Sequence, residues 1–309
     1  MAPHPLHPRP PAPGFGLRPL HPHFAAEVTG LDLGQPIPDA TFAALKAAFD
    51  WHLVLVFRDQ HLSAEQHVAF SRRFGRLEQH PLAQFRLPDQ PEILVLSNEA
   101  GADGTPRGLA DAGRRWHGDL SWMPGGSRAS LAHARLLPDG GAETLFASQI
   151  LAHQRLAPTL KARIAALEAE HDYASLATDA RTAPWRRPIL AELPPPAVHR
   201  VVRRQPQTGR SALFVNERFT TRILGVDPAE SDALLQELFA ASAAAPALYR
   251  HQWRPHDLVL WDNVAVIHRD AHHGAIGPLD APRRLHRTTV GWGRMEDACP
   301  EPPAWCIAG

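Results

Sequence analysis

The chain has 309 residues, of which 44% are hydrophobic and 21% charged, and it is long enough for one large domain with a substantial core. Lys and Arg together number 32, as do Asp and Glu, so no overall charge attracts nucleic acid or an acidic membrane, and no stretch reaches the roughly 20 uncharged apolar residues of a membrane helix. The two cysteines, Cys299 and Cys306, exclude a disulfide scaffold and a cysteine-rich zinc site, and we expect a protein of the reducing cytoplasm with no nucleic-acid or membrane partner.

The N-terminal segment begins MAPHPLHPRPPAPG. Its prolines prevent regular backbone pairing, and it lacks the apolar core of a signal peptide. We therefore expect a disordered lead-in rich in Pro and His over residues 1–18, without an export signal, and a single domain over residues 19–309.

Short runs of residues that favour β-strands follow along the whole chain. Long, Pro-rich loops separate them, which disfavours the regular strand-helix alternation of a Rossmann fold. The runs predict a mainly β protein, either a barrel or a sandwich. They cover residues 53–57, 93–96, 131–137, 213–215, 258–261 and 288–292.

A few helices are predicted to decorate this β core. The clearest begins at Ser63, which forms a capping-box pattern with Gln66 and precedes Gly75 at the expected C-terminal end. Apolar periodicity predicts two more helices, over residues 159–171 and 228–240. The Pro- and Arg-rich segment 179–196 is interpreted as a mobile loop or lid.

The tripeptide His-x-Asp is the local signature of a site with two imidazoles and one carboxylate, which leaves adjacent metal positions open. Chance predicts roughly two such tripeptides in a chain so rich in histidine, and two occur, beginning at His117 and His268. The segment around His117 reads as extended, which would place His117 and Asp119 on one face. His268 is then the best candidate for a third ligand and Asp270 a bystander. From composition alone, solvated histidines remain at least as good an explanation.

Several stretches of the chain resemble the taurine/2-oxoglutarate dioxygenase family of Fe(II) enzymes, which includes the 2,4-D and other aryloxyalkanoate dioxygenases. The resemblance spans most of residues 19–293 and implies a double-stranded β-helix, or jelly roll. It also implies Fe(II) held by His117, Asp119 and His268, with 2-oxoglutarate and O2 as co-substrates. The stretches are LVLVFRDQHLSAEQHVAFSRRFGRLEQHP, WHGDLSW, LLPDGGAETLFAS, LFVNERFTTRILG, RHQWRPHDLVLWDN and PRRLHRTTVGW.

Two arginines near the C-terminal end are candidates for binding anions. Arg283 and Arg287 are four residues apart on a predicted strand, so their side chains would emerge on one face roughly 13 Å apart while Arg284 points away. The resemblance assigns Arg283, together with Thr144, to the distal carboxylate of 2-oxoglutarate. The stretch from His268 to Arg283 is about four residues longer than in taurine dioxygenase, which leaves open an exchange of the two arginines.

The resemblance also suggests residues for the prime substrate. Arg287 and His80 match residues that bind its anionic group. Where taurine dioxygenase has a Tyr and an Asn for the substrate amine, this chain has Ala83 and Gly113. The two small residues remove polar partners and would open space in the substrate pocket, which argues against taurine. The expected substrate is a small organic anion such as an alkylsulfonate, an alkyl sulfate or an aryloxyalkanoate, hydroxylated with release of succinate and CO2. The apolar candidates for this pocket, for which core packing is an equal explanation, are Leu120, Trp122, Leu176 and Phe219.

Two other functions fit the same residues. A jelly-roll zinc hydrolase would also use two histidines and a carboxylate, although no general base is evident. A non-catalytic ligand-binding jelly roll would keep the histidines as structural residues. A homodimer or homotetramer is expected by analogy alone.

Overall fold

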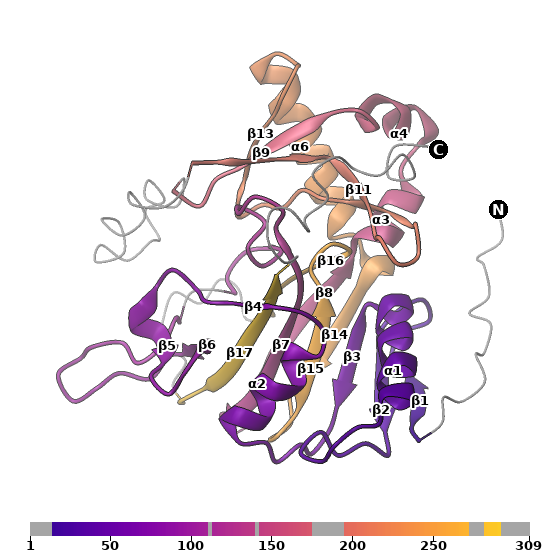
Figure 1. Ribbon diagram of the computed structural model, residues 1–309. Coiled ribbons are helices and arrows are strands. Elements are labelled where there is room, and N and C mark those ends of the chain that lie inside the picture. Colours follow the sequence, from indigo (N-terminus) through magenta and orange to yellow (C-terminus); the bar gives the residue numbers. More distant parts are fainter. Residues whose placement is uncertain (1–13, 111–112, 140–141, 175–194, 272–280, 292–309) are drawn as a thin grey trace.

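The structure is a computed structural model that describes residues 14–110, 113–139, 142–174, 195–271 and 281–291. Its largest element is a nine-stranded sheet, the major sheet, in which β4 (Leu77–Glu78) pairs with β17 beside the main path of strands (Figure 1). The other eight strands lie in the spatial order β1 (Gly16–Pro19), β2 (Ala26–Thr29), β3 (Val54–Phe57), β15 (Leu258–Asp262), β7 (Ser127–Leu136), β17 (Arg284–Gly291), β6 (Gln90–Ser97) and β5 (Arg86–Leu87).

A second sheet, the minor sheet, consists of β14 (Leu248–Gln252), β8 (Glu143–Ser148) and β16 (Val266–Asp270). The central strand β8 is antiparallel to both neighbours. A buried cluster that includes Phe146 of β8 and Trp261 of β15 fills the space between the two sheets. Two facing sheets of mostly antiparallel strands are the expected layers of a jelly roll.

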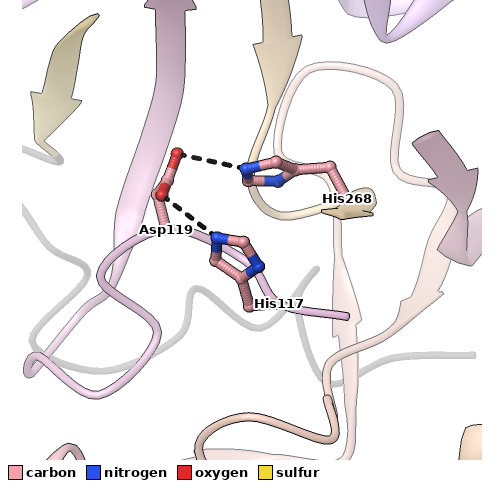
Figure 2. A group of neighbouring side chains, drawn as sticks. All are labelled: His117, Asp119 and His268. Carbon is pink, nitrogen blue, oxygen red and sulfur yellow. Dashed lines mark ion pairs between the residues drawn. The ribbon is translucent and has the colours of Figure 1, made fainter. Parts of the chain in front are cut away.

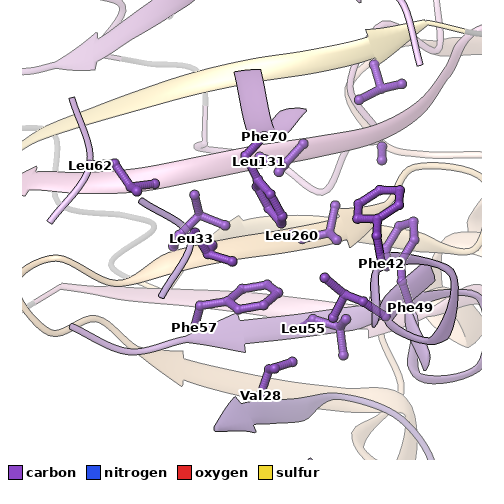
Figure 3. Close-up of a cluster of buried hydrophobic side chains, with 14 of the residues drawn as sticks. Val28, Leu33, Phe42, Phe49, Leu55, Phe57, Leu62, Phe70, Leu131 and Leu260 are labelled. Carbon is purple, nitrogen blue, oxygen red and sulfur yellow. The ribbon is translucent and has the colours of Figure 1, made fainter. Parts of the chain in front are cut away.

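The central strands of the major sheet are buried on both faces, which explains their continuous apolar runs. In β3, Leu55 and Phe57 belong to the cluster on the outer face, whereas Val54 and Val56 belong to the cluster between the sheets. This division follows from the two-residue period of a strand. β15 divides its side chains in the same way, with Leu260 on the outer face (Figure 3).

Two helices cover the outer face of the major sheet, α1 (Asp39–His52) and α2 (Ala64–Arg72). Phe42 and Phe49 of α1 and Phe70 of α2 pack into the cluster of Figure 3. The predicted capping box of α2 is confirmed, because the Ser63 hydroxyl accepts from the Gln66 backbone and the Gln66 side chain accepts from the Ser63 N–H. Such a cap stabilises a helix by about 1 kcal/mol.

An outer layer lies above the end of the sandwich where the candidate site is found. It contains the sheet β10 (Ala197–Arg200), β9 (Glu168–His171) and β13 (Thr220–Ile223) and the hairpin of β11 (Val202–Arg204) and β12 (Ser211–Leu213). Its helices are α3 (Gln149–Arg155), α4 (Pro158–Ile164) and α6 (Pro228–Ser242), and two short 3₁₀ helices, Ala83–Phe85 and Ala245–Ala247, complete the described elements. Among the described helices, none combines the length and the apolar composition of a transmembrane span.

Three expectations need correction. The lead-in was expected to reach residue 18, but Gly16–Pro19 pairs with β2 as strand β1. The helix expected over residues 159–171 ends at Ile164, and Glu168–His171 forms β9, where Ala169 and His171 are buried and Glu168 is exposed. Pairing on both sides of β9 supports this strand. The run 213–215 overlaps strand β12 only at Leu213. Most of the segment 179–196 lies outside the described residues.

Candidate metal centre and active site

The backbone brings the two candidate histidines together. His117 and His268 form an isolated antiparallel bridge, in which each N–H donates to the other residue's carbonyl at 3.1 and 2.9 Å. His268 is the third residue of β16, and His117 lies in the loop that precedes β7. A residue from the middle of the chain is thereby fixed beside one near its end.

Asp119 completes a compact group with the two histidines (Figure 2). Its two carboxylate oxygens lie 3.9 Å from His117 Nε2 and 3.9 Å from His268 Nε2. One ligand atom from each residue lies within 4.8 Å of the others, and all three residues are buried. Among the described residues, no other group of histidines, cysteines and carboxylates has such convergent atoms.

The protonation states of these residues suit a cationic metal. Burial, followed by the neighbouring His268, lowers the pKa of His117 well below its usual value, and burial also lowers the pKa of His268. Burial alone would raise the pKa of Asp119, but Arg287 and the two histidines outweigh it and lower that pKa. His117 Nδ1 lies 2.8 Å from the Arg115 carbonyl, a contact that favours a proton on Nδ1 and leaves the Nε2 lone pair for a metal. Two neutral imidazoles and one carboxylate are the donors that non-haem Fe(II) requires.

Hydrogen bonds fix the orientation of the Asp119 carboxylate. The Ser130 hydroxyl donates to Asp119 Oδ2 at 2.7 Å, and Asn263 Nδ2 donates to the Ser130 oxygen at 2.9 Å. The other carboxylate oxygen accepts from Arg287 Nη1. Asn263 also accepts from the Asp119 N–H through its side-chain oxygen at 3.3 Å. Asn263, in the turn after β15, therefore supports Asp119 from two sides.

The loop that carries Asp119 is less extended than the sequence suggested. His117 lies in the bridge, but the chain turns from Asp119 onward, and the Met123 N–H donates to the Leu120 carbonyl at 2.9 Å. Leu120 has a φ of +54°, a left-handed conformation that is costly for a side chain with a Cβ. Ser127 holds the turn by donating its hydroxyl to the Asp119 carbonyl at 2.6 Å. The turn, and not a strand face, aims Asp119 at the histidines.

A first cavity of about 80 Å³ opens on one side of this group and has room for more than a single water. Arg283 and Arg287 both line it, and so does Thr144 on β8. The Thr144 oxygen accepts from Trp253 Nε1 at 2.9 Å. Arg284 lies outside this lining and its side chain is 40% exposed, as expected.

A second cavity opens on the other side of the group, and His117 and Arg287 line both cavities. The two cavities therefore meet at the candidate metal centre. Five of the residues predicted for the prime substrate line the second cavity, namely His80, Leu120, Trp122, Phe219 and Arg287. Leu176 lies outside the described residues.

The chain matches a family model over residues 16–289, that of the "Taurine catabolism dioxygenase TauD, TfdA family". The chain belongs to this family. Two curated relatives are a pentalenolactone F synthase of Streptomyces avermitilis, 35% identical over 86% of the chain and 90% of the relative, and an (S)-phenoxypropionate/alpha-ketoglutarate-dioxygenase of Sphingobium herbicidovorans, 34% identical over 84% of the chain and 90% of the relative.

Solved structures of TauD/TfdA-type enzymes share the fold. A taurine dioxygenase from Burkholderia xenovorans superimposes with a TM-score of 0.74 and 29% identity, over 90% of the chain and 89% of that structure. AAD-2, crystallised with Mn(II) and N-oxalylglycine, gives a TM-score of 0.72 and 28% identity, over 89% and 96% of the two chains. The predictions of a jelly roll and of a dioxygenase of this family are confirmed.

Two positions at which this TauD/TfdA member departs from taurine dioxygenase do not act as expected. Ala83 is exposed in a 3₁₀ helix and lines neither cavity. Gly113 lines the first cavity, not the second, and an added Cβ would lie 2.3 Å from Asp270 Oδ2. Gly113 therefore makes space for Asp270 instead of enlarging a substrate pocket. Asp270 is not part of the convergent metal-ligand group, as expected, but Arg283 Nη1 donates to it at 3.1 Å.

Other lining residues of the second cavity were not predicted from the sequence. Tyr173 and Arg218 line the second cavity, and the Tyr173 ring lies 4.7 Å from that of Trp122 and 5.4 Å from that of Phe219, between ring centroids. The rings of Trp122, Tyr173 and Phe219 together form an aromatic wall. Arg218 is part of the NERF segment that carried the resemblance, so its charge could have been singled out. Tyr173 has no comparable signal, because it follows β9, which was expected to be a helix.

Proposed function

We propose that His117, Asp119 and His268 hold Fe(II) and that this site hydroxylates a small organic anion with 2-oxoglutarate and O2 as co-substrates. The observation that carries the proposal is that the triad lies where two cavities meet. Three protein ligands on one face leave positions for a chelating co-substrate and for O2, and the metal, when bound, supplies the oxidising chemistry that converts 2-oxoglutarate to succinate and CO2. The protein binds and orients the two substrates.

The first cavity is the proposed site of 2-oxoglutarate. Trp253 Nε1 can only donate, so the Thr144 oxygen accepts from it and the hydroxyl proton of Thr144 must point elsewhere. Because Thr144 lines the cavity, that proton is available to a carboxylate. Arg283 lines only this cavity, whereas Arg287 lines both, which supports giving the distal carboxylate to Arg283 and Thr144 and not to Arg287.

The second cavity is the proposed site of the prime substrate. Arg287 and His80 would bind its anionic group, and Arg287 Nε is buried without a hydrogen-bond partner among the described residues. The wall of Trp122, Tyr173 and Phe219 suits an apolar or aromatic body beside that anion. Relatives that act on (S)-phenoxypropionate and on sulfate esters support aryloxyalkanoates, alkyl sulfates and alkylsulfonates as the classes to test.

The decisive assay measures succinate formed from 2-oxoglutarate under air, with Fe(II) or Zn(II) added and with a panel of these anions. Succinate production that needs Fe(II) and rises with one class of anion supports the proposal. Turnover of a substrate with Zn(II) and without 2-oxoglutarate would favour the hydrolase instead, and a protein that binds anions but retains neither metal would favour the binding module. Location in the cytoplasm and assembly as a homodimer or homotetramer stay predictions, the latter to be tested by light scattering.

A further inference from the structure

We propose that Asp270 is a positioning residue that holds Arg283 in the orientation needed to bind the distal carboxylate of 2-oxoglutarate. This inference rests on the proposed function, since it concerns the proposed co-substrate cavity. It gives a role to the second His-x-Asp tripeptide, whose histidine belongs to the candidate metal centre and whose acid had no assigned part.

Asp270 holds one end of the Arg283 guanidinium. Arg283 Nη1 donates to Asp270 Oδ1 at 3.1 Å, and the two side chains are 15% and 29% exposed. Arg283 Nε is buried and has no hydrogen-bond partner among the described residues. A guanidinium presents its donors as a planar fork, so a contact at Nη1 fixes the plane and leaves the Nε edge for a second carboxylate.

The sheet places Asp270 between the two groups proposed to bind that carboxylate. In the ladder of β16 and β8, Asp270 lies directly opposite Thr144, while His268 lies opposite Phe146. Asp270 and His268 are two residues apart on one strand and so share a face. Asp270, Thr144 and Arg283 all line the first cavity. Asp270 is therefore half-buried and adjoins the proposed carboxylate site.

Two further contacts lock this arrangement. The Asp270 N–H donates to the Gly113 carbonyl at 2.8 Å, and an added Cβ at Gly113 would lie 2.3 Å from Asp270 Oδ2. The Asp270 carboxylate fits only because residue 113 has no side chain. On the other side, the Arg283 N–H donates to Asn98 Oδ1 at 2.7 Å, so the backbone of Arg283 is also held. Gly113 thus restrains Asp270 and Asn98 restrains Arg283.

Two substitutions separate the positioning role of Asp270 from the effect of its negative charge. Asp270→Ala removes the acceptor, so Arg283 gains rotamers that point away from the cavity, and the entropy of holding it is then paid when 2-oxoglutarate binds. Asp270→Asn keeps an oxygen acceptor of the same shape and loses the charge. If position is what matters, the Asn variant should resemble the wild type, whereas a purely electrostatic effect would make the Ala and Asn variants alike.

The test measures binding of keto acids to the Mn(II)-loaded protein by titration calorimetry, which needs no turnover. We expect Asp270→Ala to weaken 2-oxoglutarate binding about 10-fold, the scale of one ordinary hydrogen bond, and to leave 2-oxopentanoate binding unchanged, since this keto acid has no distal carboxylate. Asp270→Asn should bind 2-oxoglutarate within about twofold of the wild type. Gly113→Ala, which displaces the Asp270 carboxylate from the other side, should reproduce the Ala variant, and Arg284→Ala is the matched control because that side chain lies outside the cavity.

Four results would overturn the inference. Equal losses of 2-oxoglutarate affinity in the Ala and Asn variants would show an electrostatic effect instead of a positioning effect. Equal losses for 2-oxoglutarate and 2-oxopentanoate would mean that the substitution disturbs the metal site or the fold, and unchanged binding in both the Ala and Gly113 variants would mean that Asp270 does not hold Arg283. Tighter binding in the Ala and Asn variants would make Asp270 a competing anion. A wild-type protein that binds Mn(II) but no 2-oxoglutarate would instead contradict the proposed function itself.

Discussion

His117 and His268 exchange two backbone hydrogen bonds, so their distance is set by the chain before any metal binds. The histidines are held by the backbone and Asp119 by Ser130 and Arg287, so the residues of the proposed metal site are already in place. We therefore expect folding not to depend on the metal, unlike that of small domains that are unfolded without it.

Removing the metal or one histidine should therefore abolish activity and leave the fold intact. We expect chelation, His117→Ala and His268→Ala each to lower succinate formation more than about 100-fold, beyond the usual effect of residues that only support a ligand. Circular dichroism and the unfolding midpoint of the metal-free protein check the fold. Near-normal turnover in either variant would remove that histidine from the proposed metal site.

The Ser130 hydroxyl should contribute to metal affinity through Asp119. Ser130→Ala removes the hydrogen bond to Asp119 Oδ2, and such outer contacts usually change metal affinity 10- to 100-fold. We expect a loss in that range for Mn(II), measured by titration. Ser71→Ala is the matched control, because Ser71 is equally buried but hydrogen-bonds His67 and Thr288. If both variants bind Mn(II) equally, Asp119 does not depend on Ser130.

Trp253 should affect 2-oxoglutarate through Thr144. In Trp253→Phe the Thr144 hydroxyl loses its donor and is free to rotate, so we expect the KM for 2-oxoglutarate to rise roughly threefold to tenfold, the cost of about one hydrogen bond. Thr144→Val should raise the same KM, and the double variant should be no worse than the stronger single one, because both changes act on one hydrogen bond. Additive losses would show that Trp253 acts in another way.

Substitutions of the two arginines should raise the KM values of different substrates. Arg283→Ala should raise the KM for 2-oxoglutarate, and Arg287→Ala that for the prime substrate, each more than about 30-fold because a charge-assisted hydrogen bond contributes about 2 kcal/mol. Saturating Fe(II) is needed, since Arg287 also contacts Asp119. Arg284→Ala should change neither value. The opposite pattern would mean that the assignments of Arg283 and Arg287 must be exchanged.

Acid should destabilise the fold through buried histidines on the outer side of the major sheet. Burial lowers the pKa of His67 to about 3 and those of His133 and His286 to about 4. The unfolded chain binds protons from about pH 6.5 downward and the folded chain does not, so stability is lost as pH falls below about 6.5. The loss levels off near pH 4 for His133 and His286 and near pH 3 for His67. For His67 alone the loss at pH 5 is about 2 kcal/mol.

Urea unfolding at pH 7.5 and pH 5 measures this loss, and His67→Gln provides the comparison. The Gln variant should be less stable at pH 7.5 but should lose about 2 kcal/mol less between the two pH values. The same pH dependence in both proteins would show that His67 already titrates normally in the folded state.

The sequence predicted those parts of the fold whose signals are local. The apolar run 53–57 became β3, the capping box began α2 at the expected residue, and residues 228–240 lie within α6. The strands of the minor sheet were not predicted individually, because Thr144, His251 and Asp270 acquire their places from long-range pairing with each other's strands. No local periodicity encodes that register.

The candidate site shows the same division. Both His-x-Asp tripeptides were visible, and most residues predicted around them line the two cavities. The exceptions are Ala83, which lines neither cavity, and Leu176, which lies outside the described residues. The hydrogen bonds that orient these residues could not be predicted. Trp253 contacts Thr144, and Asp270 contacts Arg283, because the folded sheets fix the directions of these side chains. Resemblance to a family identifies the site residues in the sequence, whereas their hydrogen-bond partners are known only from the structure.

Anomalous diffraction from crystals grown with Mn(II) and 2-oxoglutarate tests the proposed metal centre most directly. We expect one metal peak about 2.0–2.3 Å from His117 Nε2, an Asp119 oxygen and His268 Nε2, with the keto acid in the first cavity and its distal carboxylate on Arg283 and Thr144. A peak away from these three atoms, or a metal whose remaining positions are all filled by protein, would contradict this proposal.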